Sequence, residues 1–268
     1  MSALAENDVN AGLPRGVMFA AYTVPTLRRQ VRTRDGVVLD TLRLGKPPRR
    51  GVIMCHGFGG NKNIRDFVAL AQELSLLFTV YTFDFRGHGL SPGRSTFGYR
   101  EIYDLEAVVR LAREDGNLAL GALGFSMGGV VVIRYGALVG GLQSLVAVSV
   151  PADLRTARAP GARLIRLLMG NPLGRAVAAV RYGVKVDRTW KRQEPLSTLV
   201  GRVAPQPLTI IHGEDDYIFE ADQARELKRK AGDNCRLRIY PRFGHAEQGY
   251  GPELSAYVKE VLLQDLGP

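Results

Sequence analysis

The chain has 268 residues, of which 46 % are hydrophobic and 23 % are charged, so it suits an α/β domain with a sizeable core and does not suit a disordered protein. The formal net charge is +10, which suggests a nucleic-acid or membrane partner. Eleven basic residues and only two acids lie within residues 155–205, so the excess is local and the remainder is nearly neutral. We therefore predict no nucleic-acid partner.

The apolar runs, the first residues and the cysteines bear on the compartment in which the protein is expected. No apolar run reaches the roughly 18 residues that a membrane span needs, and the first residues lack the basic and apolar regions of a signal peptide. Cys55 and Cys235 are too few for a disulfide framework and fit a reducing compartment, each as a free, buried thiol. Nothing pairs Cys55 with a base, so a thiol nucleophile is not expected. The sequence predicts a cytoplasmic protein.

Strand and helix patterns alternate along most of the chain. Residues 17–22 are apolar and predict a terminal arm or short helix packed on the domain, and the Asp-Gly turn within residues 32–39 predicts a β-hairpin. Later strands are predicted at residues 52–55, 78–83, 118–123, 145–150, 208–211 and 236–240. Helices are predicted at residues 64–77, 98–114, 130–135, 219–231 and 252–265. This alternation predicts a mostly parallel sheet with helices on both faces.

The segment Gly124-Phe125-Ser126-Met127-Gly128 lies between a predicted buried strand and a predicted buried helix. A Gly-x-Ser-x-Gly sequence at a strand-to-helix turn is the nucleophile elbow of serine hydrolases. The sharp turn forces Ser126 into a strained backbone conformation, and the glycines keep Cβ atoms out of the crowded space. The alternative interpretation is a Gly-rich turn with a surface serine.

The alternation of strands and helices breaks within residues 155–205. Helical pieces such as residues 164–169 are separated by Gly170-Asn171-Pro172, and the strand pattern resumes at residue 208. We interpret residues 155–205 as a helical cap inserted into one domain that spans residues 1–268. Trp190, the only tryptophan, lies in this segment. It suits either the wall of an apolar acyl pocket or ordinary packing.

A serine hydroxyl needs a general base within hydrogen-bond reach, and that base needs an orienting carboxylate. In an α/β sheet these groups should follow the carboxyl ends of later strands. Glu214, Asp215 and Asp216 follow the strand at residues 208–211, and His245 follows the next strand. The order serine, acid and histidine along the chain is the order expected of a fold with this elbow.

Five motifs in this order make the chain resemble the α/β-hydrolase superfamily, in particular its esterase-like and lipase-like members with a small helical cap. The motifs are His56-Gly57-Phe58-Gly59-Gly60, Asp84 to Ser91, Gly124 to Gly128, His212 to Asp216 and Gly244-His245, and the match covers roughly residues 30 to 265. The resemblance implies an α/β-hydrolase fold with Ser126 as nucleophile, Asp216 as acid and His245 as base. It also implies an oxyanion hole formed by the backbone N–H groups of Phe58 and Met127, where negative charge develops on the carbonyl oxygen.

The remaining histidines and acids have other expected roles. His56 precedes the oxyanion turn and is predicted to be a buried hydrogen-bonding residue, and a structural role is predicted for His88. His212 precedes the acid and is predicted to point into the environment of its strand. Asp215 and Glu214 remain alternatives to Asp216 as the orienting carboxylate.

Two functions from different classes fit these residues. One is the hydrolysis of carboxylic esters with small to medium acyl chains through an acyl-serine, and the other is ligand binding by a non-catalytic member of the fold. All three triad positions are filled, which favours the enzyme. A serine nucleophile disfavours dehalogenase and epoxide hydrolase chemistry, whereas a thioesterase, an aminopeptidase and a cofactor-free perhydrolase would share this triad. We expect a small-molecule ester substrate and neither a metal nor an organic cofactor, and the oligomeric state stays open.

The positive charge within residues 155–205 also has two interpretations. Arg155, Arg158, Arg163 and Arg166 recur near helical spacing and fit a solvated face. Alternatively, the charge overhangs the mouth of a pocket and favours anionic substrates or an anionic lipid surface.

Overall fold

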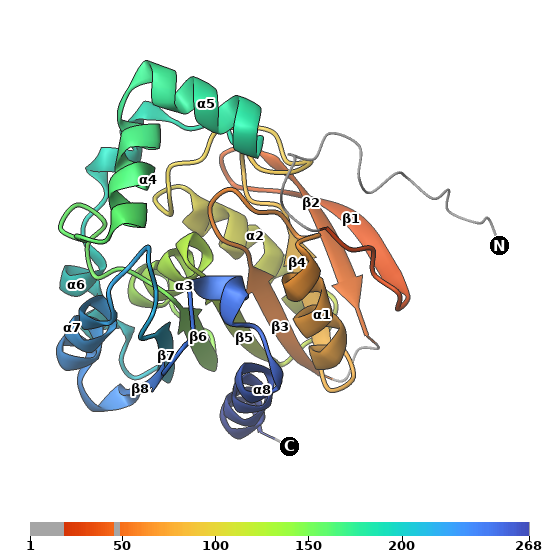
Figure 1. Ribbon diagram of the computed structural model, residues 1–268. Coiled ribbons are helices and arrows are strands. Elements are labelled where there is room, and N and C mark those ends of the chain that lie inside the picture. Colours follow the sequence, from red (N-terminus) through yellow and green to blue (C-terminus); the bar gives the residue numbers. More distant parts are fainter. Residues whose placement is uncertain (1–18, 46–48, 268) are drawn as a thin grey trace.

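The computed structural model describes residues 19–45 and 49–267 (Figure 1). An 8-stranded sheet forms its middle layer, in the order β1-β2-β4-β3-β5-β6-β7-β8. The strands are β1 (Thr26–Arg32), β2 (Val38–Leu44), β3 (Arg50–Cys55), β4 (Thr79–Phe83), β5 (Ala119–Phe125), β6 (Ser144–Val148), β7 (Leu208–Gly213) and β8 (Cys235–Tyr240). The β1–β2 hairpin and the β2–β4 pair are antiparallel, and every pair from β4 to β8 is parallel. The predicted sheet is confirmed.

Helices cover both faces of the sheet (Figure 1). They are α1 (Arg65–Leu74), α2 (Glu101–Glu114), α3 (Met127–Leu138), α4 (Pro160–Gly170), α5 (Pro172–Tyr182), α6 (Leu196–Leu199), α7 (Ala221–Ala231) and α8 (Pro252–Leu266), with 3₁₀ turns η1 (Arg188–Arg192), η2 (Val200–Val203), η3 (Gly232–Asn234) and η4 (Ala246–Gly249). Apolar side chains of α2, α3 and α7 form one core, and those of α1 and α8 form the other. Successive residues of β3 alternate between the two cores, as the period of a strand requires.

Several boundaries differ from the sequence-based prediction, and two of the differences have a clear local cause. The strand predicted to reach residue 150 ends at Val148, because Ser149 turns the chain with φ 55°. The helix predicted from about residue 98 begins at Glu101. The buried carboxylate of Glu101 accepts the N–H groups of Thr96 and Gly98, which holds the preceding residues as a loop.

The predicted N-terminal arm is only partly visible, because residues 17 and 18 lie outside the described residues. From Phe19 the chain is not helical, and Phe19 forms an isolated β-bridge with Ile64. The hydroxyl of Tyr22 donates to the carbonyl oxygen of Lys62 at 2.6 Å. The arm therefore packs beside the start of α1.

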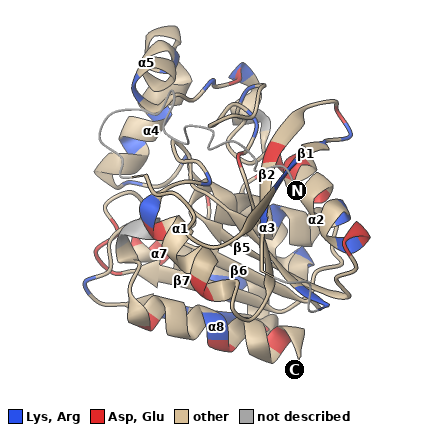
Figure 2. Cartoon of the chain, turned by 90° about the vertical axis from the view of Figure 1, so that its right-hand side faces the viewer, with Lys and Arg blue, Asp and Glu red and all other residues tan. Residues whose placement is uncertain are grey.

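The segment between β6 and β7 divides into two parts. Helices α4 and α5 pack on each other and stand away from the sheet at the top of Figure 1, whereas α6 and η2 pack on α3 and α7. Gly174 permits the close crossing of α4 and α5, since a Cβ there would lie 2.5 Å from the carbonyl oxygen of Leu167. Helices α4 and α5 carry arginines but no acid (Figure 2).

The same two helices expose a group of large apolar side chains, namely Leu164, Leu167, Leu173, Val177 and Val180. Within each helix these residues recur three or four positions apart, so they share one face of it. None of the helices in the described ranges combines the length and apolar character that a bilayer span requires.

Candidate active site

Ser126 lies at the sharp turn between β5 and α3. Its backbone has φ 51° and ψ −116°, a conformation that residues with a Cβ rarely adopt. A Cβ on Gly124 would lie 2.3 Å from the carbonyl oxygen of Gly128, and a Cβ on Gly128 would lie 2.1 Å from that of Cys55. The strand, turn and helix predicted around Ser126 are therefore present, and close backbone contacts require both glycines.

Asp216 and His245 contact each other just beyond the ends of β7 and β8. The Nδ1 atom of His245 lies 2.9 Å from Oδ1 and 2.8 Å from Oδ2 of Asp216. Oδ1 also accepts the N–H groups of Ile218 at 2.9 Å and Phe219 at 3.0 Å. A neutral His245 that donates from Nδ1 keeps its lone pair on Nε2 and can act there as a base.

The surroundings of Asp216 favour its charged form. Burial by itself would raise the pKa of Asp216, but the hydrogen bonds from His245 and from the Phe219 amide outweigh burial and lower the pKa below its ordinary value. Asp216 is therefore ionised at neutral pH. Glu214 and Asp215 are both exposed, and the Glu214 carboxylate pairs with Arg225 at 3.0 Å. Of these three acids, Asp216 is the one whose carboxylate contacts His245 in the described part of the chain.

The end of β6 holds the serine turn and the histidine loop side by side. The N–H of Ser126 donates to the carbonyl oxygen of Val148 at 2.8 Å, and the N–H of Ala246 donates to Oγ of Ser149 at 2.9 Å. Val148 and Ser149 are consecutive, so their Cα atoms are about 3.8 Å apart. Sequence reasoning missed Ser149, because its acceptor role depends on a loop that follows β8.

The two N–H groups predicted to form an oxyanion hole belong to Phe58, in the turn after β3, and to Met127, the first residue of α3. Within the described residues neither amide donates a hydrogen bond. The close contact of Gly128 with the carbonyl group of Cys55 joins these two segments. An unpaired N–H at a helix N-terminus suits a developing negative charge.

A buried ion-pair network fastens the loop that follows β3. The Nζ atom of Lys62 lies 2.6 Å from Asp84 and 2.5 Å from Asp40, and all three side chains are buried. The N–H of Lys62 also donates to Asp84 at 2.9 Å. The network ties the loop carrying Phe58 to the loop after β4. Sequence reasoning missed Lys62, because no local pattern distinguishes this lysine from a surface one.

His56 and His88 are buried beside these loops. Nε2 of His56 accepts the N–H of Phe85 at 3.0 Å, and its Nδ1 donates to the carbonyl oxygen of Gly57 at 2.8 Å. Nδ1 of His88 donates to the carbonyl oxygen of Arg86 at 3.1 Å. Burial lowers the pKa of both histidines, so both are neutral near pH 7. These contacts agree with the structural roles predicted for them.

His212 lies behind Asp216 at the end of β7. Its Nε2 donates to the carbonyl oxygen of Phe219 at 2.9 Å and lies 3.5 Å from Oδ2 of Asp216. Burial lowers the pKa of His212 as well, so it is a neutral neighbour of the acid. The ring of Phe219 also packs against His245, with the ring centroids 5.4 Å apart.

Both thiols are buried, and the described residues hold no cluster of metal-ligating side chains. Cys55 and Cys235 are free and buried, as predicted, and burial raises the pKa of both thiols. In residues 19–45 and 49–267, no group of three or more His, Cys, Asp and Glu side chains is placed to hold a metal ion.

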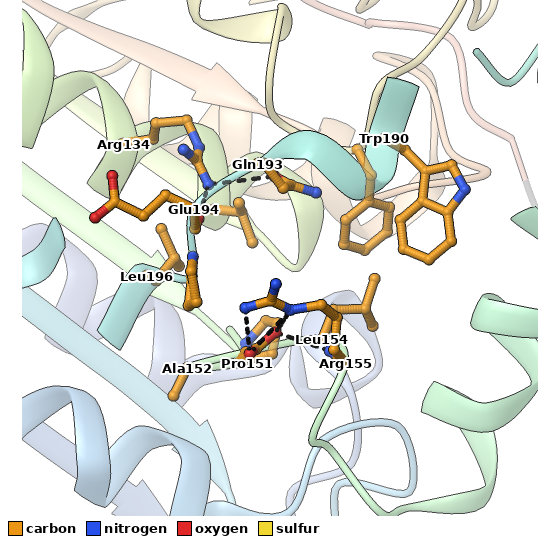
Figure 3. A pocket seen from close by; sticks show the side chains of 13 residues that line it. Arg134, Pro151, Ala152, Leu154, Arg155, Trp190, Gln193, Glu194 and Leu196 are labelled. Carbon is orange, nitrogen blue, oxygen red and sulfur yellow. Dashed lines mark hydrogen bonds and ion pairs between the residues drawn. The ribbon is translucent and has the colours of Figure 1, made fainter. Parts of the chain in front are cut away.

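A small pocket begins one helical turn from Ser126. Val130, whose N–H donates to the carbonyl oxygen of Ser126 at 3.0 Å, lines this pocket together with Phe97. Trp190 lines it as well (Figure 3). Trp190 is also buried, and its Nε1 donates to the carbonyl oxygen of Met169 at 3.1 Å. Trp190 is therefore both a pocket wall and a packing residue.

Comparison with known proteins shows the family to which the chain belongs. Residues 52–251 match the model of the alpha/beta hydrolase family. The chain is similar to a monoacylglycerol lipase of Mycolicibacterium smegmatis, with 25 % identity over 244 residues covering 78 % of this chain and 85 % of that protein. It is also similar to a putative monoglyceride lipase of Schizosaccharomyces pombe, with 28 % identity over 259 residues covering 81 % of this chain and 67 % of that protein.

Among solved structures, an esterase of Pyrococcus furiosus has the same fold. The two structures superpose with a TM-score of 0.76 at 24 % sequence identity, and the match covers 95 % of this chain and 99 % of the esterase. The family match spans most of the chain and includes the turn at Ser126, the Asp216–His245 pair, most of β3 and all of β4 to β8. The chain belongs to the alpha/beta hydrolase family.

Proposed function

We propose that the chain is a serine hydrolase that cleaves carboxylic esters through an acyl intermediate on Ser126. The observation that carries this proposal is the hydrogen-bonded Asp216–His245 pair, whose loop is bonded to the same end of β6 as the strained serine turn. Membership of the alpha/beta hydrolase family and the lipase and esterase names of similar proteins support it.

In the proposed reaction, Oγ of Ser126 attacks the ester carbonyl carbon while Nε2 of His245 takes the hydroxyl proton. Asp216 stays ionised, stabilises the imidazolium and keeps the ring in the correct tautomer. The N–H groups of Phe58 and Met127 stabilise the negative oxygen of the tetrahedral intermediate. The intermediate expels the alcohol, which takes the proton from His245. A water molecule, deprotonated by His245, then attacks the acyl group and releases the carboxylic acid and free Ser126.

The proposed substrate is an ester with a small to medium apolar acyl chain, such as a monoglyceride. Phe97, Val130 and Trp190 are apolar walls of a pocket that begins one helical turn from Ser126. The exposed apolar side chains of α4 and α5 suit contact with a lipid-like substrate, and the names of two similar proteins favour this class. On this proposal α4 and α5 form the cap over the site.

The test combines labelling with a substrate panel. A fluorophosphonate should label Ser126, and Ser126→Ala should lower kcat by about four to six powers of ten without loss of fold. Ser197→Ala, a change in α6, is the matched control and should keep its activity. The panel comprises p-nitrophenyl esters of increasing acyl length, a monoacylglycerol, and matching thioester and amide substrates.

Two outcomes would contradict different parts of the proposal. Ester hydrolysis retained by purified Ser126→Ala protein would exclude the acyl-serine mechanism. A preference for the thioester, or for the amide, would keep Ser126 as nucleophile and replace the ester as substrate.

A further inference from the structure

Arg134 is a buried cation held by neutral groups. It lies on α3, eight residues after Ser126 and therefore about two helical turns further along. Its side chain is only 3 % exposed. Nη2 donates to the backbone oxygen of Glu194 at 2.6 Å and to Oε1 of Gln193 at 3.2 Å (Figure 3). Nε is buried and has no hydrogen-bond partner among the described residues.

No acid in the described part of the chain forms an ion pair with Arg134. The Glu194 residue is exposed, and its backbone oxygen rather than its carboxylate accepts the arginine. The Glu101 carboxylate is occupied by the N–H groups of Thr96 and Gly98. Burial lowers the pKa of Arg134 to about 10, although the charges of Glu194 and Glu101 act to raise it. A buried ion without a partner is strongly destabilising, so this position is suited to an anionic ligand.

A cavity of about 30 Å³ adjoins this arginine (Figure 3). Such a volume accommodates about two water-sized groups, which is comparable to the two oxygens of a carboxylate. Val130 and Trp190 line the cavity together with Arg134. Asp153 is also part of the wall, but Arg155 pairs with its carboxylate, Nε at 2.9 Å and Nη2 at 2.8 Å, which reduces repulsion of an incoming anion.

We propose that this cavity is an anion subsite in which Arg134 binds a carboxylate group. The carboxylate is either that of a small free acid or the second carboxylate of an ester whose carbonyl group lies at Ser126, and the latter source rests on the proposed function. Along α3 the two residues are separated by a rise of about 12 Å, which a dicarboxylic acyl chain can span. Nη2 already donates to Glu194 and Gln193, so the carboxylate bonds to Nη1, which has no hydrogen-bond partner among the described residues.

The first experiment tests a free carboxylate without using catalysis. The full chain is unfolded thermally in sodium formate and in sodium chloride of equal ionic strength, because the chloride series gives the general effect of ionic strength on Tm. We expect formate to raise Tm saturably by about 1–3 °C. Arg134→Gln should abolish this rise. Arg158→Gln, which changes an exposed arginine outside this pocket, should retain it.

The second experiment tests the carboxylate of a substrate. Mono-p-nitrophenyl esters of dicarboxylic acids, from succinate to sebacate, are compared with neutral p-nitrophenyl esters of the same acyl length. At the chain length that reaches Arg134, we expect Arg134→Gln to lower the ratio of kcat/KM for the anionic ester to that for the neutral ester by about tenfold or more. Formate should compete with the anionic ester. Arg134→Lys should keep part of the preference, since it keeps the charge and changes the position of the N–H donors.

The outcomes distinguish the two possible sources of the carboxylate from each other, and both of them from a wrong proposal. A response to formate alone identifies a free carboxylate as the ligand, and a response of the ester ratio identifies the substrate. The proposal is overturned if Tm shows no Arg134-dependent response to formate and both ester series respond alike to the substitutions. If Arg134→Gln does not fold, the wild-type protein decides, because absence of both formate stabilisation and formate competition overturns the proposal. Failure to hydrolyse any ester would contradict the proposed function and leave the thermal experiment to test the subsite.

Discussion

Two buried charges near the serine turn, Asp216 and Arg134, have opposite surroundings. Asp216 accepts hydrogen bonds from His245 and from two backbone N–H groups, and its lowered pKa means that the charged form is favoured. Arg134 has only neutral acceptors, and for a base a lowered pKa means that the charged form is disfavoured. The acid–base pair is thus complete within the chain, whereas the arginine lacks the partner that a ligand can supply.

The two charges also differ in where their partners come from. Asp216 takes N–H groups two and three residues further along the chain, as an Asx-type turn does. Arg134 bonds to residues 59 and 60 positions away, on a segment that must first fold back over α3. A change at Asp216 therefore tests a locally built site, and a change at Arg134 tests a site built by tertiary packing.

The largest effect is expected from Asp216→Asn. An amide cannot hold His245 in the tautomer that leaves Nε2 free to accept a proton, so kcat should fall by about 10³- to 10⁴-fold. Asp215→Asn is the matched control, because Asp215 is exposed, and should change kcat little. Steady-state kinetics with one p-nitrophenyl ester check both variants. Greater damage from Asp215→Asn would move the acid by one residue.

Ser149 should act as a positioning residue for His245. Ser149→Ala removes the acceptor for the Ala246 N–H, and the displaced loop should lower kcat by about 10- to 100-fold with KM nearly unchanged. Ser149→Gly also removes the acceptor but relieves the positive φ, so it separates backbone strain from hydrogen bonding. Equal losses of kcat in both variants support the hydrogen bond. Full activity of Ser149→Gly would contradict it.

Lowering the pH should reduce the free energy of unfolding first through the neutral histidines and only at lower pH through Asp216. His56, His88 and His212 have pKa values lowered by burial, so below the ordinary value of 6.5 the unfolded chain binds protons that the folded chain does not. The free energy of unfolding should fall from that pH downward, by at most about 1.4 kcal/mol per pH unit for each histidine. The pKa of Asp216 lies below its ordinary value of 3.8, so Asp216 keeps its charge over the pH range in which the histidines of the unfolded chain bind protons.

Urea unfolding at pH 7 and at pH 5.5 measures this dependence, with His88→Gln as the comparison variant. His88 has one ring nitrogen without a partner among the described residues, and its replacement should remove about one histidine's share of the slope. An unchanged slope in a folded His88→Gln protein would show that His88 does not remain neutral in the folded state.

The smallest effect is expected from the exposed arginines of the segment between β6 and β7. Arg163, Arg181 and Arg188 are exposed, and their replacement by Gln should lower kcat/KM for an anionic ester by about two- to threefold at low ionic strength only. Arg166 and Arg175 are unsuitable targets, because their guanidinium groups donate to backbone carbonyl oxygens. Salt distinguishes such long-range attraction from binding at the buried Arg134. Equal salt responses of a neutral and an anionic ester would exclude steering.

Much of the fold could be predicted from the sequence, because its signals are local. The alternation of strand and helix patterns predicted the parallel sheet, and the Asp-Gly turn predicted the hairpin. The Gly-x-Ser-x-Gly spacing predicted the turn at Ser126, whose geometry depends on glycines within two residues of it. The resemblance to the α/β-hydrolase superfamily pointed to Asp216 and left Asp215 and Glu214 as alternatives, and the contact with His245 in the structure favours Asp216. Their catalytic roles remain proposals for the experiments above.

Only the tertiary structure reveals the roles of Ser149, Lys62 and Arg134. Ser149 bonds to a residue 97 positions away, and Lys62 pairs with acids on β2 and after β4. Arg134 lies in an apolar helical pattern, where an arginine is compatible with a solvated position until the segment at residues 193–194 packs over it. Periodicity and spacing describe neighbours along the chain. Burial and hydrogen-bond partners across the chain arise only when the strands assemble, and these decide which polar side chain is paired and which is left to bind a ligand.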